Sequence, residues 1–167
     1  MNLIAAVSSN WGIGYKNRLL FHIHEDLQRF KELTINKTVV MGHNTFKSLP
    51  GGKPLSNRVN IVLSREKNLQ IPGVTICDSL SALEIVLQSY SPENIFIIGG
   101  ENIYTQLLNR CKLAYITKVD ANPSADVFMP NIDKLPDWKL IEEILPKKQC
   151  EIAYRYSIYA NGLFFYK

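Results

Sequence analysis

The sequence of 167 residues has few cysteines and no long hydrophobic segment. Cys77, Cys111 and Cys150 are far apart and form no CxxC pair, so neither a disulfide framework nor a zinc ribbon is indicated. We therefore expect a reducing, cytoplasmic location. No apolar run approaches the roughly 20 residues that a helix needs to cross a bilayer, so we expect no membrane association.

Charge of one sign is also scarce. The formal net charge is +4, and the densest basic patch is only Lys147 and Lys148. No basic stripe interleaved with aromatic residues is present, so nucleic acid is not an expected partner.

The motifs of hydrolytic and metal chemistry are missing as well. There is no GxSxG sequence, and none of the cysteines lies in a nucleophile motif. His22 and His24 are two residues apart, so they would not share a helix face, and we expect no metal site.

The sequence does contain an alternation of short apolar runs and amphipathic segments. The runs at 2–9, 38–42, 59–64, 73–77, 94–100 and 113–120 resemble buried strands, and helical patterns separate several of them. This alternation is typical of an α/β protein with a mostly parallel sheet flanked by helices. Segments 138–145 and 152–167 show period-two alternation instead, which predicts antiparallel C-terminal strands in a mixed sheet. With 46% apolar residues and no linker, residues 1–167 are expected to form one domain.

The segment FHIHEDLQRFKELT, residues 21–34, predicts a helix with an acid on its apolar face. Asp26 falls between Phe30 and Leu33, whereas Glu25 falls on the polar face. A desolvated carboxylate is costly unless something bonds it. Either this edge of the helix is exposed, or Asp26 binds a ligand.

Three predicted strand ends carry residues suited to phosphate. One strand runs into Gly99 and Gly100 and then into a helix, and another runs into Gly42 followed by His43, Asn44 and Thr45. Helix N-termini and close backbone approach favour phosphate, although a simple tight turn explains the Gly99–Gly100 signal equally well. Ser64 and Arg65 form a third such end, for which a surface arginine is the simpler explanation. Residues 8–20 predict a long connection without regular structure, and such loops are usually functional.

Taken in order, the motifs resemble the dihydrofolate reductase family, of the single-domain bacterial type, over essentially the whole chain. They are LIAAV at the start, Ile13–Gly14, EDLQRFK around Asp26, VVMGHNTFKSL, NRVNIVLSR, IIGGENIY and AYITKVDA. The resemblance implies a dihydrofolate reductase-like fold and NADPH-dependent reduction of 7,8-dihydrofolate to tetrahydrofolate. The hydride would pass from nicotinamide C4 to pterin C6, and water would protonate N5. A monomer is expected.

The resemblance also implies a substrate site. Asp26 would be the carboxylate that bonds the 2-amino group and N3 of the pterin ring, and Thr117 would support it. Arg58 would pair with the α-carboxylate of the substrate, a task that suits a planar two-pronged donor. The remaining substrate contacts implied by the family are Ile4, Ala5, Leu27, Phe30, Leu49 and Ile98.

The cofactor site is implied in the same way. Ser64 and Arg65 would receive the 2′-phosphate of NADPH, and the Gly99–Gly100 peptide would be cis. The other cofactor contacts implied are Ala6, Ile13, Gly14, Leu19, Gly42, His43, Asn44, Thr45, Leu63, Gly99, Gly100, Glu101, Asn102, Ile103 and Tyr104.

The sequence departs from the family pattern in four places. Leu20–Phe21 replaces a Pro-Trp pair, and His24 replaces the usual proline that opens the helix. His43 stands where many relatives have an arginine, and the segment LPGGKPLSNR is slightly longer than usual. The closure of loop 9–20 and the cofactor charge contacts are the properties that these departures affect.

Two alternatives stay open at the level of sequence. A pterin or pyrimidine reductase of the same fold, such as a riboflavin-pathway reductase, shares the strand-GG-helix signal. A non-catalytic nucleotide-binding or RNA-binding module fits the modest positive charge, but it gives no purpose to Asp26.

Overall fold

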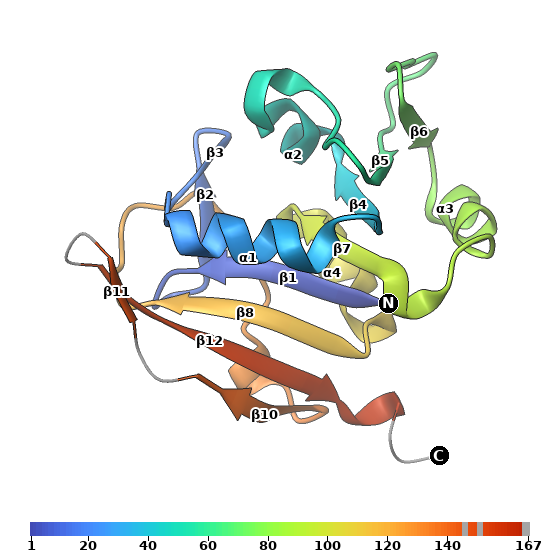
Figure 1. Cartoon of the computed structure of the whole chain (residues 1–167). Coiled ribbons are helices and arrows are strands. Elements are labelled where there is room, and N and C mark those ends of the chain that lie inside the picture. The colour runs from blue at the N-terminus through green and yellow to red at the C-terminus, as the bar shows by residue number, and fades with distance from the viewer. Residues whose placement is uncertain (145–146, 150–151, 165–167) are drawn as a thin grey trace.

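A nine-stranded sheet forms the centre of the described chain (Figure 1), in the order β10-β12-β8-β1-β7-β4-β5-β6 with β11 beside β12. The computed structural model describes residues 1–144, 147–149 and 152–164. Cys150 and the side chains of Lys147 and Lys148 lie outside that description.

The sheet is mixed, as predicted. The parallel strands are β1 (Asn2–Val7), β4 (Thr38–Gly42), β5 (Val59–Leu63), β6 (Val74–Cys77), β7 (Ile95–Gly99) and β8 (Leu113–Val119). The antiparallel strands are β10 (Trp138–Glu143), β11 (Lys147–Gln149) and β12 (Ile152–Asn161). The prediction of an α/β fold with an antiparallel C-terminal part is confirmed.

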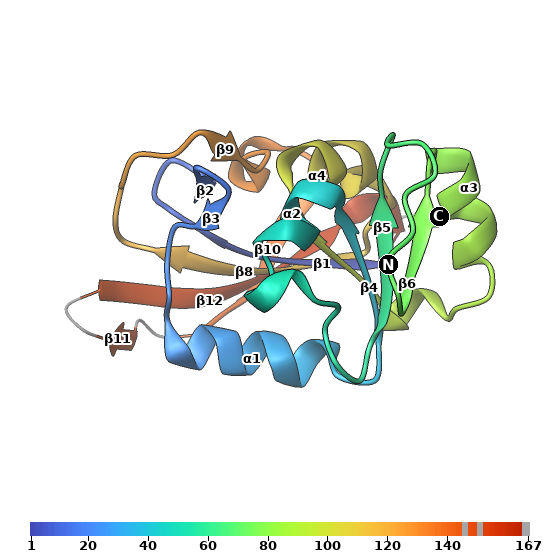
Figure 2. The same ribbon diagram turned by 90° about the horizontal axis from the view of Figure 1, so that it is seen from above.

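Helices cover both faces of this sheet. They are α1 (His24–Thr34), α2 (His43–Ser48), α3 (Leu80–Leu87) and α4 (Glu101–Leu107). Short 3₁₀ turns follow at Pro50–Gly52, Pro92–Asn94, Leu108–Arg110, Ile132–Lys134 and Gly162–Phe164. Viewed from above, α1 lies on one side of the sheet and α4 on the other (Figure 2).

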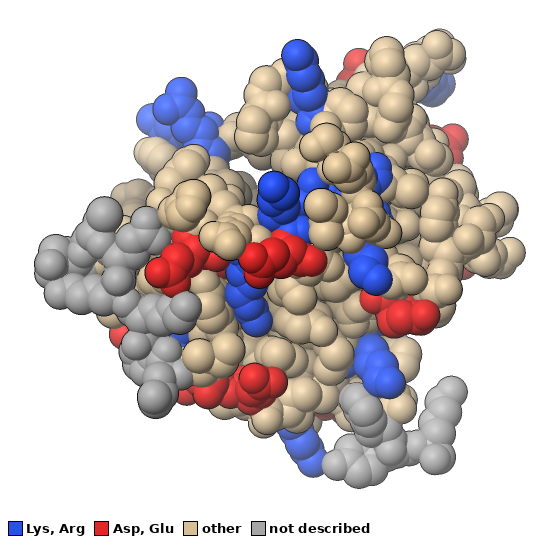
Figure 3. All heavy atoms as spheres, viewed as in Figure 1, with Lys and Arg blue, Asp and Glu red and all other residues tan. Residues whose placement is uncertain are grey.

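Covering both faces explains why the strands are apolar at successive positions. In β7, Ile97 belongs to the main core cluster with residues of α3 and α4, whereas Ile98 packs against a second cluster around Phe46 of α2. A third, smaller cluster holds Ile23 with Tyr154 and Tyr156 beneath the start of α1. On the α1 face, acidic and basic side chains are interspersed (Figure 3). Among the described residues, no helix is long and apolar enough to cross a membrane.

The structure differs from the sequence prediction in the segment 8–20, which contains two strands rather than an irregular loop. β2 (Gly12–Tyr15) and β3 (Arg18–Leu19) form a hairpin, and β2 also pairs with β9 (Val127–Phe128). Lys16 and Asn17 have φ of 49° and 59°, so both central residues of the turn have the positive φ of a type I′ turn. The prediction was wrong because β2 is completed by a strand more than a hundred residues away, which no local pattern reveals.

Candidate active site

Asp26 lies in the first turn of α1, over the sheet. Its side chain is half-buried, and its Oδ1 accepts a short hydrogen bond from the Thr117 hydroxyl of β8. Burial raises the pKa of the Asp26 carboxyl group, while the Thr117 hydrogen bond and the positive charge of Arg29 act in the opposite direction. The structure thus has the partial desolvation of Asp26 that the sequence predicted and the Thr117 contact that the resemblance implied.

Glu25, the adjacent acid, has a different role. It accepts a hydrogen bond of 2.9 Å from the Tyr154 hydroxyl of β12, which ties the start of α1 to the sheet. The two neighbouring carboxylates are thus used in different ways, one to hold the helix and one beside Thr117.

Strand register explains how the partners of Asp26 come together. Tyr115 and Thr117 are two residues apart on β8, so they point to the same face, and Tyr156 of β12 lies directly opposite Thr117. Ile4 and Ala6 of β1 pair with Tyr115 and Thr117 from the other side. The face of the sheet beneath Asp26 is therefore built from three neighbouring strands.

Apolar residues predicted to contact the substrate divide into two groups. Phe30 is half-buried and Leu27 is 41% exposed on α1, while Leu49 and Ile98 pack at the edge of the second core cluster. Ala5 instead packs against the main cluster on the opposite face, so its side chain points away from the face of Asp26.

Arg58 is held at the far end of α1. Its Nε donates to the Thr34 hydroxyl at 3.1 Å, its Nη1 to the Ser56 carbonyl at 2.7 Å and its Nη2 to the Lys31 carbonyl at 3.4 Å. Burial lowers the pKa of the guanidinium, which nevertheless stays charged at physiological pH. Asp26 and Arg58 therefore stand at opposite ends of one helix, which suits a ligand with a nitrogen-rich ring and a distant carboxylate.

The two glycine turns lie side by side at the carboxyl ends of β4 and β7. Met41 pairs with Gly99, and a Cβ on Gly42 would be 4.0 Å from the Gly100 nitrogen. A Cβ on Gly100 would come within 3.1 Å of Thr45 Oγ1, and Gly99 has a φ of 130°. The Gly99–Gly100 peptide is cis, as the resemblance implied.

These turns leave backbone donors for a ligand. Among the described residues, no side chain caps the first turn of α2 or of α4. The glycines also keep the approach to these N–H groups free of side chains, which is what a pyrophosphate requires. The backbone N–H groups at the starts of α2 and α4 therefore fit the pyrophosphate of a dinucleotide cofactor.

Several predicted cofactor residues have their side chains elsewhere. Ile103 and Tyr104 are in the main core cluster, where the Tyr104 hydroxyl donates to the Ile4 carbonyl at 2.7 Å. The backbone N–H groups of both residues donate to the Gly100 carbonyl at 2.9 Å. Asn44, Glu101 and Asn102 are exposed on the first turns of the two helices.

The end of β5 carries the residues predicted to bind the 2′-phosphate. Ser64 is buried and its Oγ lies 3.4 Å from His43 Nδ1, while Arg65 is exposed. Glu66 Oε2 is 3.3 Å from His43 Nδ1. Glu66 would repel a phosphate bound here. The positive charge of Arg65 is therefore more important for phosphate binding than it would be in a site without this acid. Leu63, at the end of β5, packs against the main core cluster.

The hairpin of β2 and β3 supplies the remaining predicted cofactor residues. Ile13 and Gly14 are half-buried, and Leu19 is 54% exposed. Phe21, which replaces the family tryptophan, packs against the cluster of Ile23, Tyr154 and Tyr156. This chain therefore has an aromatic side chain at this position but no indole N–H.

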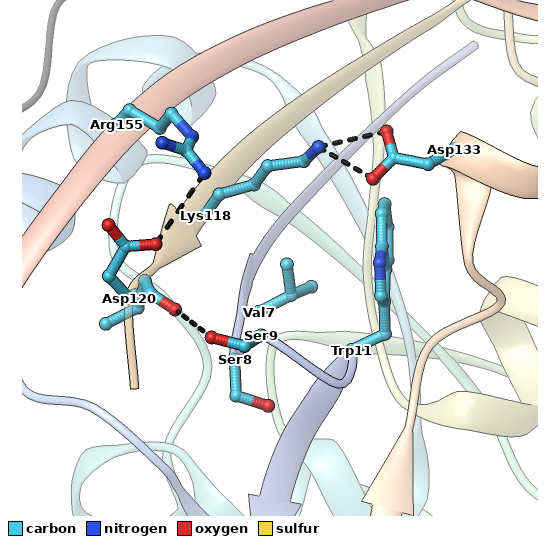
Figure 4. A pocket seen from close by; sticks show the side chains of 9 residues that line it. Val7, Ser8, Ser9, Trp11, Lys118, Asp120, Asp133 and Arg155 are labelled. Atoms are coloured by element: carbon cyan, nitrogen blue, oxygen red, sulfur yellow. Dashed lines mark hydrogen bonds and ion pairs between the residues drawn. The ribbon is translucent and has the colours of Figure 1, made fainter. Parts of the chain in front are cut away.

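A separate cavity of about 200 Å³ is lined by residues from the end of β1, the segment that follows it, β8 and β12 (Figure 4). Its lining includes Ser8, Trp11, Lys118, Asp133 and Arg155, and the charged groups in it are paired with one another. None of the predicted site residues lines it, so it is not the predicted substrate site. In the described part of the chain, no group of three or more His, Cys, Asp or Glu residues is placed to hold a metal.

Sequence reasoning missed one residue near Asp26. Arg29 follows Asp26 by one helical turn, and its guanidinium lies 4.2 Å from the ring centre of Tyr156 and 5.9 Å from that of Tyr115. The spacing of three residues was the available signal, because such pairs are neighbours on a helix.

Comparisons with known proteins agree with this geometry. The sequence profile of the family described as dihydrofolate reductase matches residues 1–161. A dihydrofolate reductase of Buchnera aphidicola subsp. Acyrthosiphon pisum is 38% identical over 157 residues, which cover 94% of this chain and 95% of that protein. The dihydrofolate reductase of Bacillus subtilis is 34% identical, covering 94% and 90%.

A solved structure is similar in three dimensions as well. The dihydrofolate reductase from Enterococcus faecalis complexed with NADP(H) and RAB-propyl has a TM-score of 0.85 and 30% identity, covering 96% of this chain and 95% of that one. These matches favour a folate enzyme over the two alternatives. The chain therefore belongs to the dihydrofolate reductase family, the oxidoreductases that reduce dihydrofolate to tetrahydrofolate with NADPH.

Proposed function

We propose that Asp26 binds the pterin ring of dihydrofolate, with Thr117 fixing the carboxylate. The supporting observation is a half-buried carboxyl group whose Oδ1 accepts a hydrogen bond from Thr117, while no hydrogen bond from the described residues reaches its second oxygen. An ionised carboxylate accepts two parallel hydrogen bonds, which matches the 2-amino group and N3 of a pterin.

The rest of the substrate would lie along α1. Leu27, Phe30, Leu49, Ile98 and Ile4 would contact the pterin and p-aminobenzoyl groups, and Ala5 would contribute only backbone. Arg58 would pair with the α-carboxylate, because its hydrogen bonds to Thr34, Ser56 and Lys31 fix the guanidinium at the end of α1.

The cofactor would lie across the strand ends. Backbone N–H groups after Gly42 and Gly100 would bond the pyrophosphate, and Ser64 and Arg65 would bind the 2′-phosphate. Ala6, Ile13, Gly14 and Leu19 would flank the nicotinamide. When bound, NADPH supplies the hydride that pterin C6 receives.

The residues of the chain then control the proton. Asp26 polarises the bound pterin and raises the basicity of N5, which takes its proton from water. The segment 9–20 covers the site and excludes bulk solvent during the reaction.

The test is the variant Asp26→Asn, which keeps the shape but removes the charge. We expect it to fold and to lose about 100-fold in turnover of dihydrofolate at neutral pH, measured by the nicotinamide absorbance. Glu25→Gln is the matched control, because this neighbouring acid bonds Tyr154, and it should keep its turnover. A near-normal rate for Asp26→Asn would contradict the assignment.

We further propose that residues 1–167 act as one domain, as a monomer and in the cytoplasm. The support is the sheet itself, in which β12 from the end of the chain pairs with β8, and β8 pairs with β1. Sedimentation of the purified enzyme tests the monomer, and cell fractionation tests the location.

A further inference from the structure

Arg29 lies outside the site proposed above, yet it shares a surface with it. It is half-buried on α1, one turn after Asp26, so the two side chains emerge on adjacent parts of the same helix face. The acid precedes the base in the sequence, which is the favourable order for such a pair.

Two aromatic rings hold the guanidinium. Its carbon lies 4.2 Å from the centre of the Tyr156 ring and 5.9 Å from the centre of the Tyr115 ring, both within the range of a cation–π interaction (about 6 Å). Its Nη1 is buried and has no hydrogen-bond partner among the described residues. The Arg29 guanidinium is therefore held mainly by the faces of two aromatic rings. Its positive charge is not neutralised by an ion pair at hydrogen-bonding distance among the described residues.

The same rings flank the partner of Asp26. Thr117, which donates to Asp26, is two residues from Tyr115 on β8 and directly opposite Tyr156 of β12. Arg29 and Asp26 thus contact neighbouring residues of β8 and β12 on the same face of the sheet.

The charged and titratable groups around Arg29 come from four elements. They are Asp26 of α1, Tyr115 of β8, Tyr156 of β12 and Glu142 of β10. For Asp26, burial raises the pKa, while the Thr117 hydrogen bond and the Arg29 charge lower it. Since Arg29 stays charged at physiological pH, its field favours the ionised carboxylate.

We propose that Arg29 is a positioning residue whose stacked guanidinium holds Asp26 in the ionised form and so sets the low-pH limit of pterin binding. This inference rests on the proposed role of Asp26. The ionised carboxylate is the form that accepts both pterin N–H groups, so binding weakens as pH falls and Asp26 takes up a proton.

The experiment measures the titration midpoint of the Asp26 carboxyl group in the ligand-free wild type and variants by ¹³C NMR of protein labelled at aspartate. The Asp26 signal is identified as the one that is missing from Asp26→Asn. In Arg29→Met, which keeps much of the side-chain volume but not the charge, the Asp26 midpoint moves to higher pH. Arg29→Lys restores the charge and returns the midpoint toward that of the wild type. Lys31→Met removes the same charge from an exposed position two residues away and leaves the midpoint unchanged.

Dihydrofolate binding, measured by quenching of protein fluorescence, gives a second readout. Arg29→Met should bind about threefold or more weakly than the wild type at the low-pH end and equally well at high pH. Arg29→Gln serves as a second neutral variant in case Arg29→Met fails to fold.

The outcomes separate the two proposals. An Asp26 midpoint that is unmoved in the folded neutral variants, with Asp26→Asn still impaired in binding, overturns the role of Arg29 alone. Wild-type affinity in Asp26→Asn at neutral pH overturns the proposed role of Asp26 itself.

Discussion

Asp26 and Glu25 are adjacent in the chain but differ in their surroundings. Glu25 is exposed and bonds Tyr154, whereas Asp26 is desolvated beside Thr117 and Arg29. Burial favours the protonated form of a carboxyl group over the charged form. The burial of Asp26 therefore makes the folding stability depend on pH, an effect that is separate from catalysis.

We predict that the stability of Asp26→Asn increases relative to that of the wild type as pH rises. The pKa of Asp26 is raised in the folded protein, so the folded state binds more protons than the unfolded state between the ordinary value, about 3.9, and the raised one. The stability of the wild type therefore falls through this window, whereas that of the variant does not. Urea denaturation at a series of pH values measures the difference; a constant difference from acid to neutral pH would contradict this sign.

Arg65 gives a second prediction at the residue scale. Arg65 follows β5 with one residue between and carries a fixed positive charge, whereas the next residue, Glu66, is an acid that contacts His43. In Arg65→Ala we expect the ratio of kcat/KM for NADPH over NADH to fall about tenfold or more, because a charge-assisted phosphate contact is lost. Lys67→Ala, an exposed control two residues away, should keep the ratio. An unchanged ratio in Arg65→Ala would refute the assignment.

A single site residue could be predicted from the sequence only where a local pattern marked it. Asp26 was identified because an acid interrupted an apolar helix face, and Thr117 was identified only through the family resemblance. Arg29 was not identified, since its importance comes from Tyr115 and Tyr156, which reach it from distant strands.

At the scale of elements, the hairpin of β2 and β3 is packed tightly against a distant segment. A Cβ on Gly12 would come within 2.6 Å of the Ala125 Cβ and 2.9 Å of Ser8 Oγ. Side chains are therefore excluded at Gly12 by neighbours rather than by backbone conformation.

We predict that Gly12→Ala costs about 1–3 kcal/mol of stability, as overpacking does, and that it lowers turnover because the hairpin shifts. Thermal unfolding and the dihydrofolate assay measure the two effects. Adding Ala125→Gly removes the nearest clash and should recover part of the loss. Equal stability of Gly12→Ala and the wild type would show that the hairpin tolerates the added methyl group.

The other elements were largely predictable. The six parallel strands and the helix of residues 24–34 followed from hydrophobic periodicity, which depends only on neighbours in the chain. The hairpin was missed because β2 pairs with β9, a contact between distant segments.

At the scale of the whole molecule, Asp133 links three separate parts of the chain. It accepts hydrogen bonds from Lys118 of β8 at 2.8 Å and from Tyr159 of β12 at 2.6 Å. Burial acts to raise the pKa of Asp133, but these hydrogen bonds and the charges of Lys118 and Arg155 outweigh it, so the pKa is lowered.

We predict that Asp133→Asn loses about 1 kcal/mol of stability at neutral pH, a value that allows for solvent screening of the partly exposed pair of Asp133 and Lys118. The pKa is lowered on folding, so the contribution is present above the unfolded value, about 3.9, and is lost as pH falls through the folded value. Denaturation at neutral and strongly acidic pH checks this, with Asp137→Asn as an exposed control. An equal deficit at both pH values would contradict it.

The sequence by itself determined the α/β class, the mixed sheet and the acid on the face of α1, because these depend on local periodicity and residue type. The family resemblance added the roles proposed for the other site residues. Only the tertiary structure decided that Tyr115, Thr117 and Tyr156 meet beneath Asp26, that Ile103 and Tyr104 turn into the core, and that Glu66 approaches His43. Strand register and packing fix these contacts, and both join residues that are far apart in the chain.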